Sequence, residues 1–172
     1  MAFDAFMKIE ASYKGLDLSG ESTDKTHTNW IQLAEYSFGV NQPHAGSRSD
    51  SGAASGGRAD FDAFTCKKSV DKASNSLMIC CARGDHLPKI TIELCRATGE
   101  KTPFVKLIYT DCIITKVTVN GSGGSEGEIP TEDLEFNFGS VEFNYQLTDH
   151  KSGALVGGMI PKKWDVIANA AV

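Results

Sequence analysis

The sequence contains no hydrophobic run that approaches the roughly 18 apolar residues of a membrane span. Its opening stretch, MAFDAFMKIEASYKG, also lacks the basic segment and the unbroken apolar segment of a signal peptide. Apolar and polar residues alternate there instead. We therefore expect a protein without a membrane partner that is made and folded in the cytoplasm.

Positive charge is also scarce. The chain has 17 Lys and Arg residues against 22 Asp and Glu residues, which gives a net charge of -5. The only adjacent basic pairs are Lys67-Lys68 and Lys162-Lys163. Because nucleic acid binding requires a basic patch or stripe, we expect no nucleic-acid partner.

Metal-binding and redox spacings are missing as well. The odd set of five cysteines has no CxxC spacing, which argues against a disulfide framework and against a zinc site: Cys66, Cys80, Cys81, Cys95 and Cys112. We expect reduced and mostly buried thiols. The histidines fall in predicted loops without HxxxH or HExxH spacing, so we expect solvated turn residues: His27, His44, His86 and His150.

The sequence indicates no catalytic or cofactor site. The stretch NGSGGSEG (120–127) invites comparison with a phosphate-binding loop, but Glu126 stands where GxGxxG needs glycine. A pair of carboxylates of the glycosidase kind that assembles only in space remains an alternative. We expect no enzyme, no catalytic residue, no metal and no cofactor.

What the sequence does contain is alternation of apolar and polar residues, which is clearest in DLEFNFGSVEFNYQL (133–147). The apolar residues from Leu134 to Phe138 occupy even positions, and after Gly139-Ser140 they move to odd positions from Val141. A glycine bulge within one strand would produce this change. We favour the bulge over the alternative of a tight hairpin, because a curved barrel needs such a device.

Similar alternation predicts further strands at 3–9, 34–40, 59–66, 89–97, 103–119 and around Trp164. One helix is predicted in DKASNSLMICCARG (71–84), with Ser74 or Asp71 as its cap and Gly84 at its end. The polar stretch 43–57 reads as a surface loop. The expected fold is mainly β, a small β-barrel of two packed antiparallel sheets with one flanking α-helix, in a single domain over 1–172.

The strand predicted at 104–119 is apolar on both faces. One side is expected to hold Val105, Leu107, Tyr109, Ile113, Val117 and Val119, and the other Phe104, Ile108, Cys112 and Ile114. A small barrel buries only one face of a strand, so the second face needs cover. Another subunit would supply it, and the expected interface residues are Val105, Leu107, Ile108 and Ile114.

Several stretches together resemble the haemolysin-coregulated protein (Hcp) family of bacterial type VI secretion. They run in order over nearly the whole chain: AFDAFMKIE, GESTDKTH, YSFG, FTCKKSVDKASNSLMICCARGDH, TIELCRATGE, NGSGGSEGE, EFNFGSVEFNY and KKWDVIANA. The resemblance implies a β-barrel that assembles into homohexameric rings. These rings stack into a tube, which a sheath of other proteins drives out beneath a trimeric spike protein. Family members also carry secreted effector proteins in the ring and leave the cell without a signal peptide.

The resemblance also implies roles for individual residues. Glu35 and Ser37, opposite Tyr36 and Phe38 on the second strand, would face the lumen, and Ser122 would lie near its mouth. The loop 45–57 would contact the next ring through Gly46, Ser47, Arg48, Asp50 and Ser51. Three alternatives stay open: a monomeric ligand-binding β-barrel, a hydrolase, and a phage-tail-tube-like protein of another contractile injection machine.

Overall fold

The computed structural model describes residues 3–10, 15–43, 57–96, 101–122, 129–149, 152 and 154–172. Its elements in chain order are β1 (Phe3–Ile9), β2 (Ile31–Leu33), β3 (Glu35–Ser37), β4 (Val40–Asn41), β5 (Asp60–Phe61), β6 (Phe64–Ser69), α1 (Ser74–Arg83), β7 (His86–Arg96), β8 (Pro103–Asn120), β9 (Thr131–Thr148), β10 (Leu155–Asp165) and β11 (Ala170–Ala171). All strand pairs are antiparallel. The expected fold class, mainly β with one short helix, is confirmed.

The barrel closes at a bend in the second predicted strand. The large sheet runs in the order β11-β10-β9-β8-β7-β1-β2, and β6 joins β9 to β3. Strands β2 and β3 flank Ala34, so the chain leaves β1 and joins β6 within a few residues. The single strand expected at 34–40 is divided into β3 and β4, because Glu35–Ser37 pair with β6 whereas Val40 pairs with β5. Of its apolar face, Tyr36 packs against the core, whereas Phe38 is exposed.

The inward and outward faces of β8 and β9 exchange at the same place in both strands, at Asp111 and Gly139. Asp111 has a φ of 52° and lies opposite Gly139, while the pairs on either side, Thr110 with Ser140 and Cys112 with Phe138, keep one register. The prediction of one continuous strand with a change of parity at Gly139 is confirmed, but the bulge expected there is wrong, because the register does not shift at this point. A Cβ on Gly139 would lie 3.1 Å from the Cβ of Asp111, so glycine fits this crossing.

This turnover corrects the expectation that β8 has two apolar faces. Its inward residues change from odd to even positions at Asp111, so one face holds the buried side chains on both sides of the turn. Val105, Leu107 and Ile114 belong to the chain's own core, with 7%, 0% and 2% of their surface exposed. Placing these three at a subunit interface was therefore wrong, and only half-buried Ile108 stays available.

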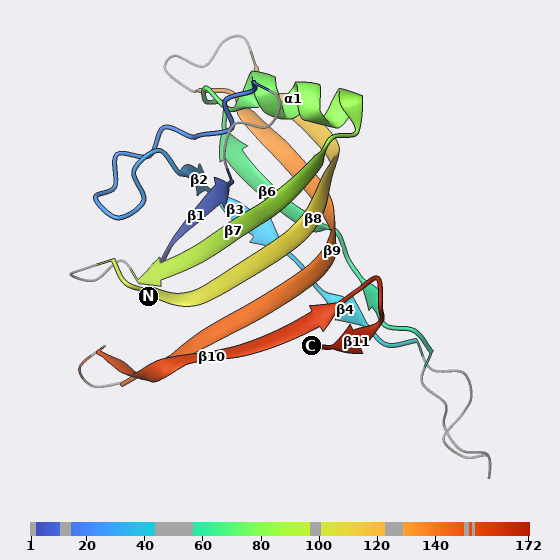
Figure 1. Cartoon of the computed structure of the whole chain (residues 1–172). Helices are drawn as coiled ribbons and strands as arrows, with labels where there is room; N and C mark the ends of the chain where they lie inside the picture. The colour runs from blue at the N-terminus through green and yellow to red at the C-terminus, as the bar shows by residue number, and fades with distance from the viewer. Residues whose placement is uncertain are drawn as a thin grey trace.

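The helix α1 lies across one end of the barrel (Figure 1). Leu77 and Cys80 point into the core cluster, which is the burial that an amphipathic helix requires. Its N-cap is Ala73, not Ser74 or Asp71, although the Asp71 carboxylate accepts a hydrogen bond from the Ala73 N–H at 2.9 Å. Gly84 ends the helix in the left-handed conformation, with a φ of 63°, as predicted.

All five cysteines are free thiols, and four are buried, as expected. Burial raises the pKa of Cys66, Cys95 and Cys112 to about 12. Thiols with such pKa values form little thiolate at neutral pH and are poor nucleophiles. Among the residues placed here, none belongs to a helix long and apolar enough to cross a bilayer.

Candidate functional site

The outer surface of β3, β6, β8 and β9 is polar. Glu35 and Ser37 are exposed on β3, because Tyr36 between them points inward and packs against the core. We use the name polar sheet face for the outward side chains of these strands: Glu35, Ser37, Thr65, Lys67, Lys116, Asp133 and Glu135. These residues line a shallow hollow of about 310 Å³.

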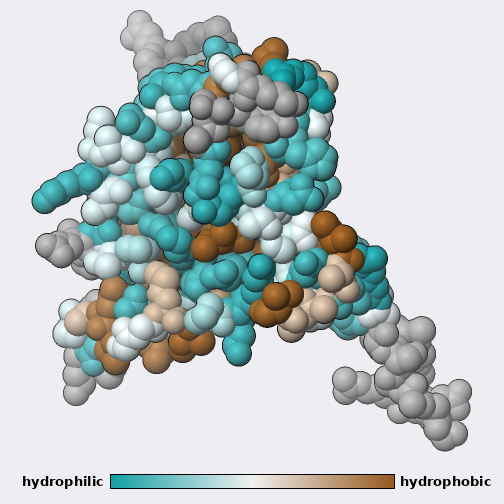
Figure 2. Space-filling model, in the orientation of Figure 1, coloured by the Kyte–Doolittle hydropathy of each residue, from teal (hydrophilic) through white to brown (hydrophobic). Residues whose placement is uncertain are grey.

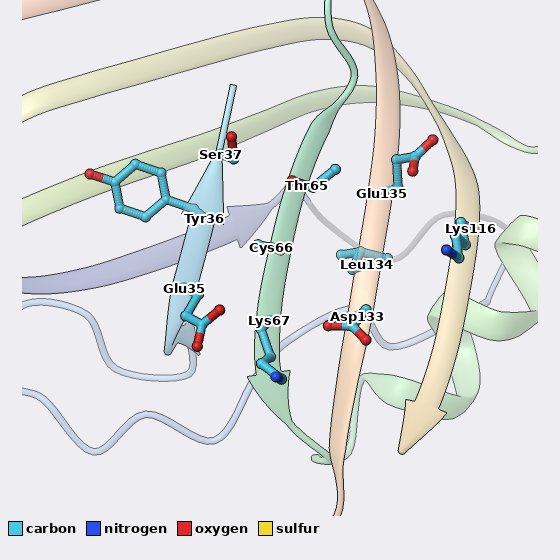
Figure 3. A pocket seen from close by; sticks show the side chains of 10 residues that line it. All are labelled: Glu35, Tyr36, Ser37, Thr65, Cys66, Lys67, Lys116, Asp133, Leu134 and Glu135. Atoms are coloured by element: carbon cyan, nitrogen blue, oxygen red, sulfur yellow. The ribbon is translucent and has the colours of Figure 1, made fainter. Parts of the chain in front are cut away.

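Charges of opposite sign face each other across the polar sheet face. Glu35 pairs in register with Lys67, and Lys67 with Asp133, so one row alternates in sign across three strands (Figure 3). In the adjacent β8–β9 pair, Lys116 lies opposite Glu135. Opposite charges on neighbouring strands stabilise a sheet, and their alternation leaves no large patch of one sign. The face therefore suits contact with varied polar surfaces.

No side chain on this face has the environment of a nucleophile or a general base. Cys66, which lies between Thr65 and Lys67, is buried on the other side of β6 and has the raised pKa given above. The carboxylates of Glu135 and Asp133 accept hydrogen bonds from Thr115 and Asn120 at 3.0 and 2.6 Å. Within the described ranges, no group of three or more His, Cys, Asp or Glu side chains is placed to hold a metal ion.

The structure brings together only part of the expected set. Glu35 and Ser37 share the polar sheet face, while Ser122 is exposed two residues beyond the end of β8, at the rim of the same sheet. The partners Lys67, Asp133 and Glu135 were missed, although the alternation of β6 and β9 places them on the outward side. The loop residues Gly46, Ser47, Arg48, Asp50 and Ser51 lie outside the described residues.

A second feature is an apolar surface on the hairpin of β9 and β10. Tyr145 lies opposite Ile160, and Leu147 opposite Val156, so their side chains share one face of the sheet. With Phe143 they form what we call the apolar hairpin face, each residue with 37% to 52% of its surface exposed. In Figure 2 apolar side chains gather along the lower edge of the molecule, where β10 lies in Figure 1.

The apolar hairpin face continues the interior of the barrel. Phe143 lies opposite buried Leu107, and Tyr145 opposite buried Val105, so the same sheet face runs from the core to solvent. Within the described chain, the outer edge of β10 pairs only with β11, at Trp164 and Asp165. An uncovered apolar face beside an unpaired strand edge marks a surface for another protein chain.

The structure overturns the expectation that His27 is solvated. Its ring is 1% exposed and stacks on Phe6 with the ring centroids 4.3 Å apart. Nδ1 lies 3.0 Å from Oδ1 of Asp24, and Nε2 lies 2.9 Å from Oε2 of Glu93. His27 therefore fastens the segment between β1 and β2 onto β7. The Asp-x-x-His spacing in DKTH was the available signal, because Asp24 also accepts the His27 backbone N–H.

We predict that Asp24→Asn weakens the fold at neutral pH. Hydrogen bonds from His27, and further ones from Thr26 and Lys101, hold the pKa of Asp24 well below its usual range despite partial desolvation. A carboxyl group whose pKa is lowered in the native state stabilises it above the unfolded pKa of about 3.9, and this contribution is lost as the pH falls.

The measurement is urea unfolding of the wild type and Asp24→Asn at pH 7, 5 and 3. The difference in unfolding free energy should be largest at pH 7 and should narrow below about pH 4. Asp60→Asn, at an exposed position on β5, is the control and should change little at any pH. A difference between the wild type and Asp24→Asn that grows on acidification would contradict this assignment.

Comparisons with known proteins agree over most of the chain. Residues 6–145 match the family model described as type VI secretion system effector, Hcp. The protein hcp1 of Pseudomonas aeruginosa is 31% identical over 170 residues, which span 98% of each chain. A structure described as a type six secretion system protein superposes with a TM-score of 0.89 at 25% identity, covering 99% of this chain and 100% of the other. Hcp1 from Salmonella typhimurium superposes with a TM-score of 0.78 at 26% identity, covering both chains fully.

Proposed function

Because the chain belongs to the Hcp family of the type VI secretion system, we propose that it is a subunit of the secretion tube. In this role six copies form a ring, the rings stack, and the lumen carries effector proteins. Family membership makes the chain a structural and non-enzymatic protein of this system. Its polar sheet face, without a nucleophile or a general base, is consistent with that role.

The observation that carries the proposal is the apolar hairpin face. Five large apolar side chains on one sheet face are half exposed in a single copy, and a soluble monomer rarely leaves such a surface uncovered. A ring of identical head-to-tail contacts covers the same surface on every copy and leaves none at an end. We therefore propose the principal subunit contact on β9 and β10, with Ile108 on β8 as a further candidate.

The polar sheet face would line the lumen. The exposure of Glu35 and Ser37 on this face supports the proposal, and Ser122 is exposed just beyond the end of β8. Rows of alternating charge leave no large patch of one sign, which suits a channel through which different effectors pass. We propose that the loop residues 46–51 contact the next ring, and that the sheath and the trimeric spike are further partners. The protein would be held in the cytoplasm before firing and secreted afterwards.

Light scattering on purified protein tests the assembly. The expected mass is six times the 18.5 kDa of the chain, and negative-stain micrographs should show rings with an open centre. A single 18.5 kDa species at micromolar concentration would refute the ring and favour a monomeric barrel. Rings that form but fail to restore secretion to a strain lacking the tube protein would refute the tube role alone.

A further inference from the structure

An aromatic pocket lies between the β9–β10 hairpin and the small sheet of β4 and β5. Its volume is about 410 Å³, and its wall includes Phe38, Phe61, Phe138 and Phe143. Pockets of this size, largely apolar with a few polar groups, are typical of sites for small molecules. This pocket lies on the other side of the sheet from the polar sheet face, since Phe138 and Phe143 point inward where Glu135 points outward.

The aromatic residues that line the pocket pack against one another in the absence of a ligand. The rings of Tyr109 and Phe138 lie with centroids 4.6 Å apart, and Phe61 meets Phe138 edge to face at 6.1 Å. Phe38 and Phe143 face each other at 6.3 Å. Tyr109, Phe138 and Phe143 lie on β8 and β9 of the barrel, which fix this part of the wall without an occupant, while Phe38 and Phe61 come from the segment before β4 and from β5.

Two buried hydrogen-bond donors on the lining residues have no partner. They are the hydroxyl group of Tyr109 and Nε1 of Trp164, and neither meets an acceptor among the described residues. Burial raises the pKa of Tyr109, so its hydroxyl keeps its proton and remains a donor. Buried donors in native proteins are normally satisfied. An occupant that carries an acceptor oxygen would satisfy these.

The charge of the lining is positive. Lys162 and Lys163 line the pocket, and no Asp or Glu of the described chain does. Lys162 lies opposite Phe143, and it shares the inner face of β10 with Trp164, two residues further along the strand. Lys162 therefore supplies a positive charge beside the aromatic wall of the pocket.

We propose that this aromatic pocket binds a small amphipathic carboxylate, such as a medium-chain fatty acid. The alkyl chain lies against the rings of Phe38, Phe138 and Phe143, and the carboxylate lies at Lys162 and Trp164. This assignment does not depend on the tube role, although Phe143 also belongs to the apolar hairpin face. The alternative occupant is a side chain from a second copy, and the test distinguishes the two.

Calorimetry on the full-length protein in its native assembly tests the proposal with decanoate below its micelle concentration. We expect saturable binding, and about tenfold weaker binding of decanol, because hydrogen bonds to a charged group are stronger than those to a neutral one. Lys162→Gln with Lys163→Gln should reduce decanoate affinity about tenfold and leave decanol affinity unchanged. Lys25→Gln, at an exposed lysine far along the chain, is the matched control and should bind decanoate as the wild type does.

Trp164 gives a second readout. In a Trp30→Phe background it is the only tryptophan, so its emission should change saturably with decanoate. Tyr109→Phe, which removes only the hydroxyl, should fold normally and bind more weakly. Absence of saturable decanoate binding, or equal affinity for decanol in all variants, would overturn the proposal. An emission that changes with protein dilution and ignores decanoate would assign the pocket to a second copy.

Discussion

Replacing Lys68 with methionine is expected to lower the free energy of unfolding by about 3–5 kcal/mol, because it leaves a carboxylate buried without its counter-charge. Lys68 and Glu132 are both fully buried, and Nζ lies 2.8 Å from Oε1 of Glu132. Neither oxygen of Glu132 receives a well-aligned hydrogen bond, so the contact is an ion pair. The same ammonium group lies 2.8 Å from Oδ1 of Asp71 and 3.2 Å from Oγ of Ser74, which fastens the start of α1 to β6.

The neighbouring residue gives a matched control. Lys67 lies on the outward side of β6, so Lys67→Met should change the unfolding free energy by no more than about 0.5 kcal/mol. The double variant Lys68→Met with Glu132→Leu should recover most of the loss, since removing both charges removes the cost of burying one. Guanidinium unfolding followed by circular dichroism, at one fixed protein concentration, measures all four proteins. Equal midpoints for the two lysine variants would show that the buried pair contributes nothing.

The alternation of apolar and polar residues predicted the strands because each strand has one buried face and one solvent-exposed face. The same alternation indicates that both members of the buried ion pair face inward. Lys68 follows Phe64 and Cys66 on the buried face of β6, and Glu132 precedes Leu134 on the buried face of β9. The ion pair itself was not predicted from the sequence. Parity alone would have placed both side chains in the interior.

Other features depend on single backbone positions that alternation does not encode. Asp111 adopts a positive φ, which few residues other than glycine do. At this residue the buried positions of β8 change from odd to even, so the apolar residues expected on two faces lie on one. The strand expected at 34–40 is continuous in pattern, yet it is divided in the structure, because Glu35–Ser37 pair with β6 and Val40 pairs with β5. Three of the four interface residues expected on β8 lie in the core for the first of these reasons. The uncovered apolar surface is the apolar hairpin face on β9 and β10, where the inner face of the sheet extends beyond the core into solvent.

Ile160→Asp is expected to abolish the ring while the barrel stays folded. The side chain is half exposed in one copy, opposite Tyr145 in the centre of the apolar hairpin face, so a carboxylate there remains hydrated in the monomer. In a ring the same carboxylate would be buried against apolar groups without a partner, which is strongly unfavourable. Light scattering should report the mass of one 18.5 kDa chain instead of six, with an unchanged circular dichroism spectrum.

The adjacent residue tests whether the apolar hairpin face itself is responsible. Pro161→Asp places the same carboxylate one position along β10, on the opposite face of the strand, where the residue is exposed. This variant should form rings of wild-type mass, because the substituted side chain points away from the apolar hairpin face. Rings from Ile160→Asp, or loss of rings in both variants, would remove the subunit contact from this face. If only Ile160→Asp abolishes the ring, the subunit contact lies on the apolar hairpin face.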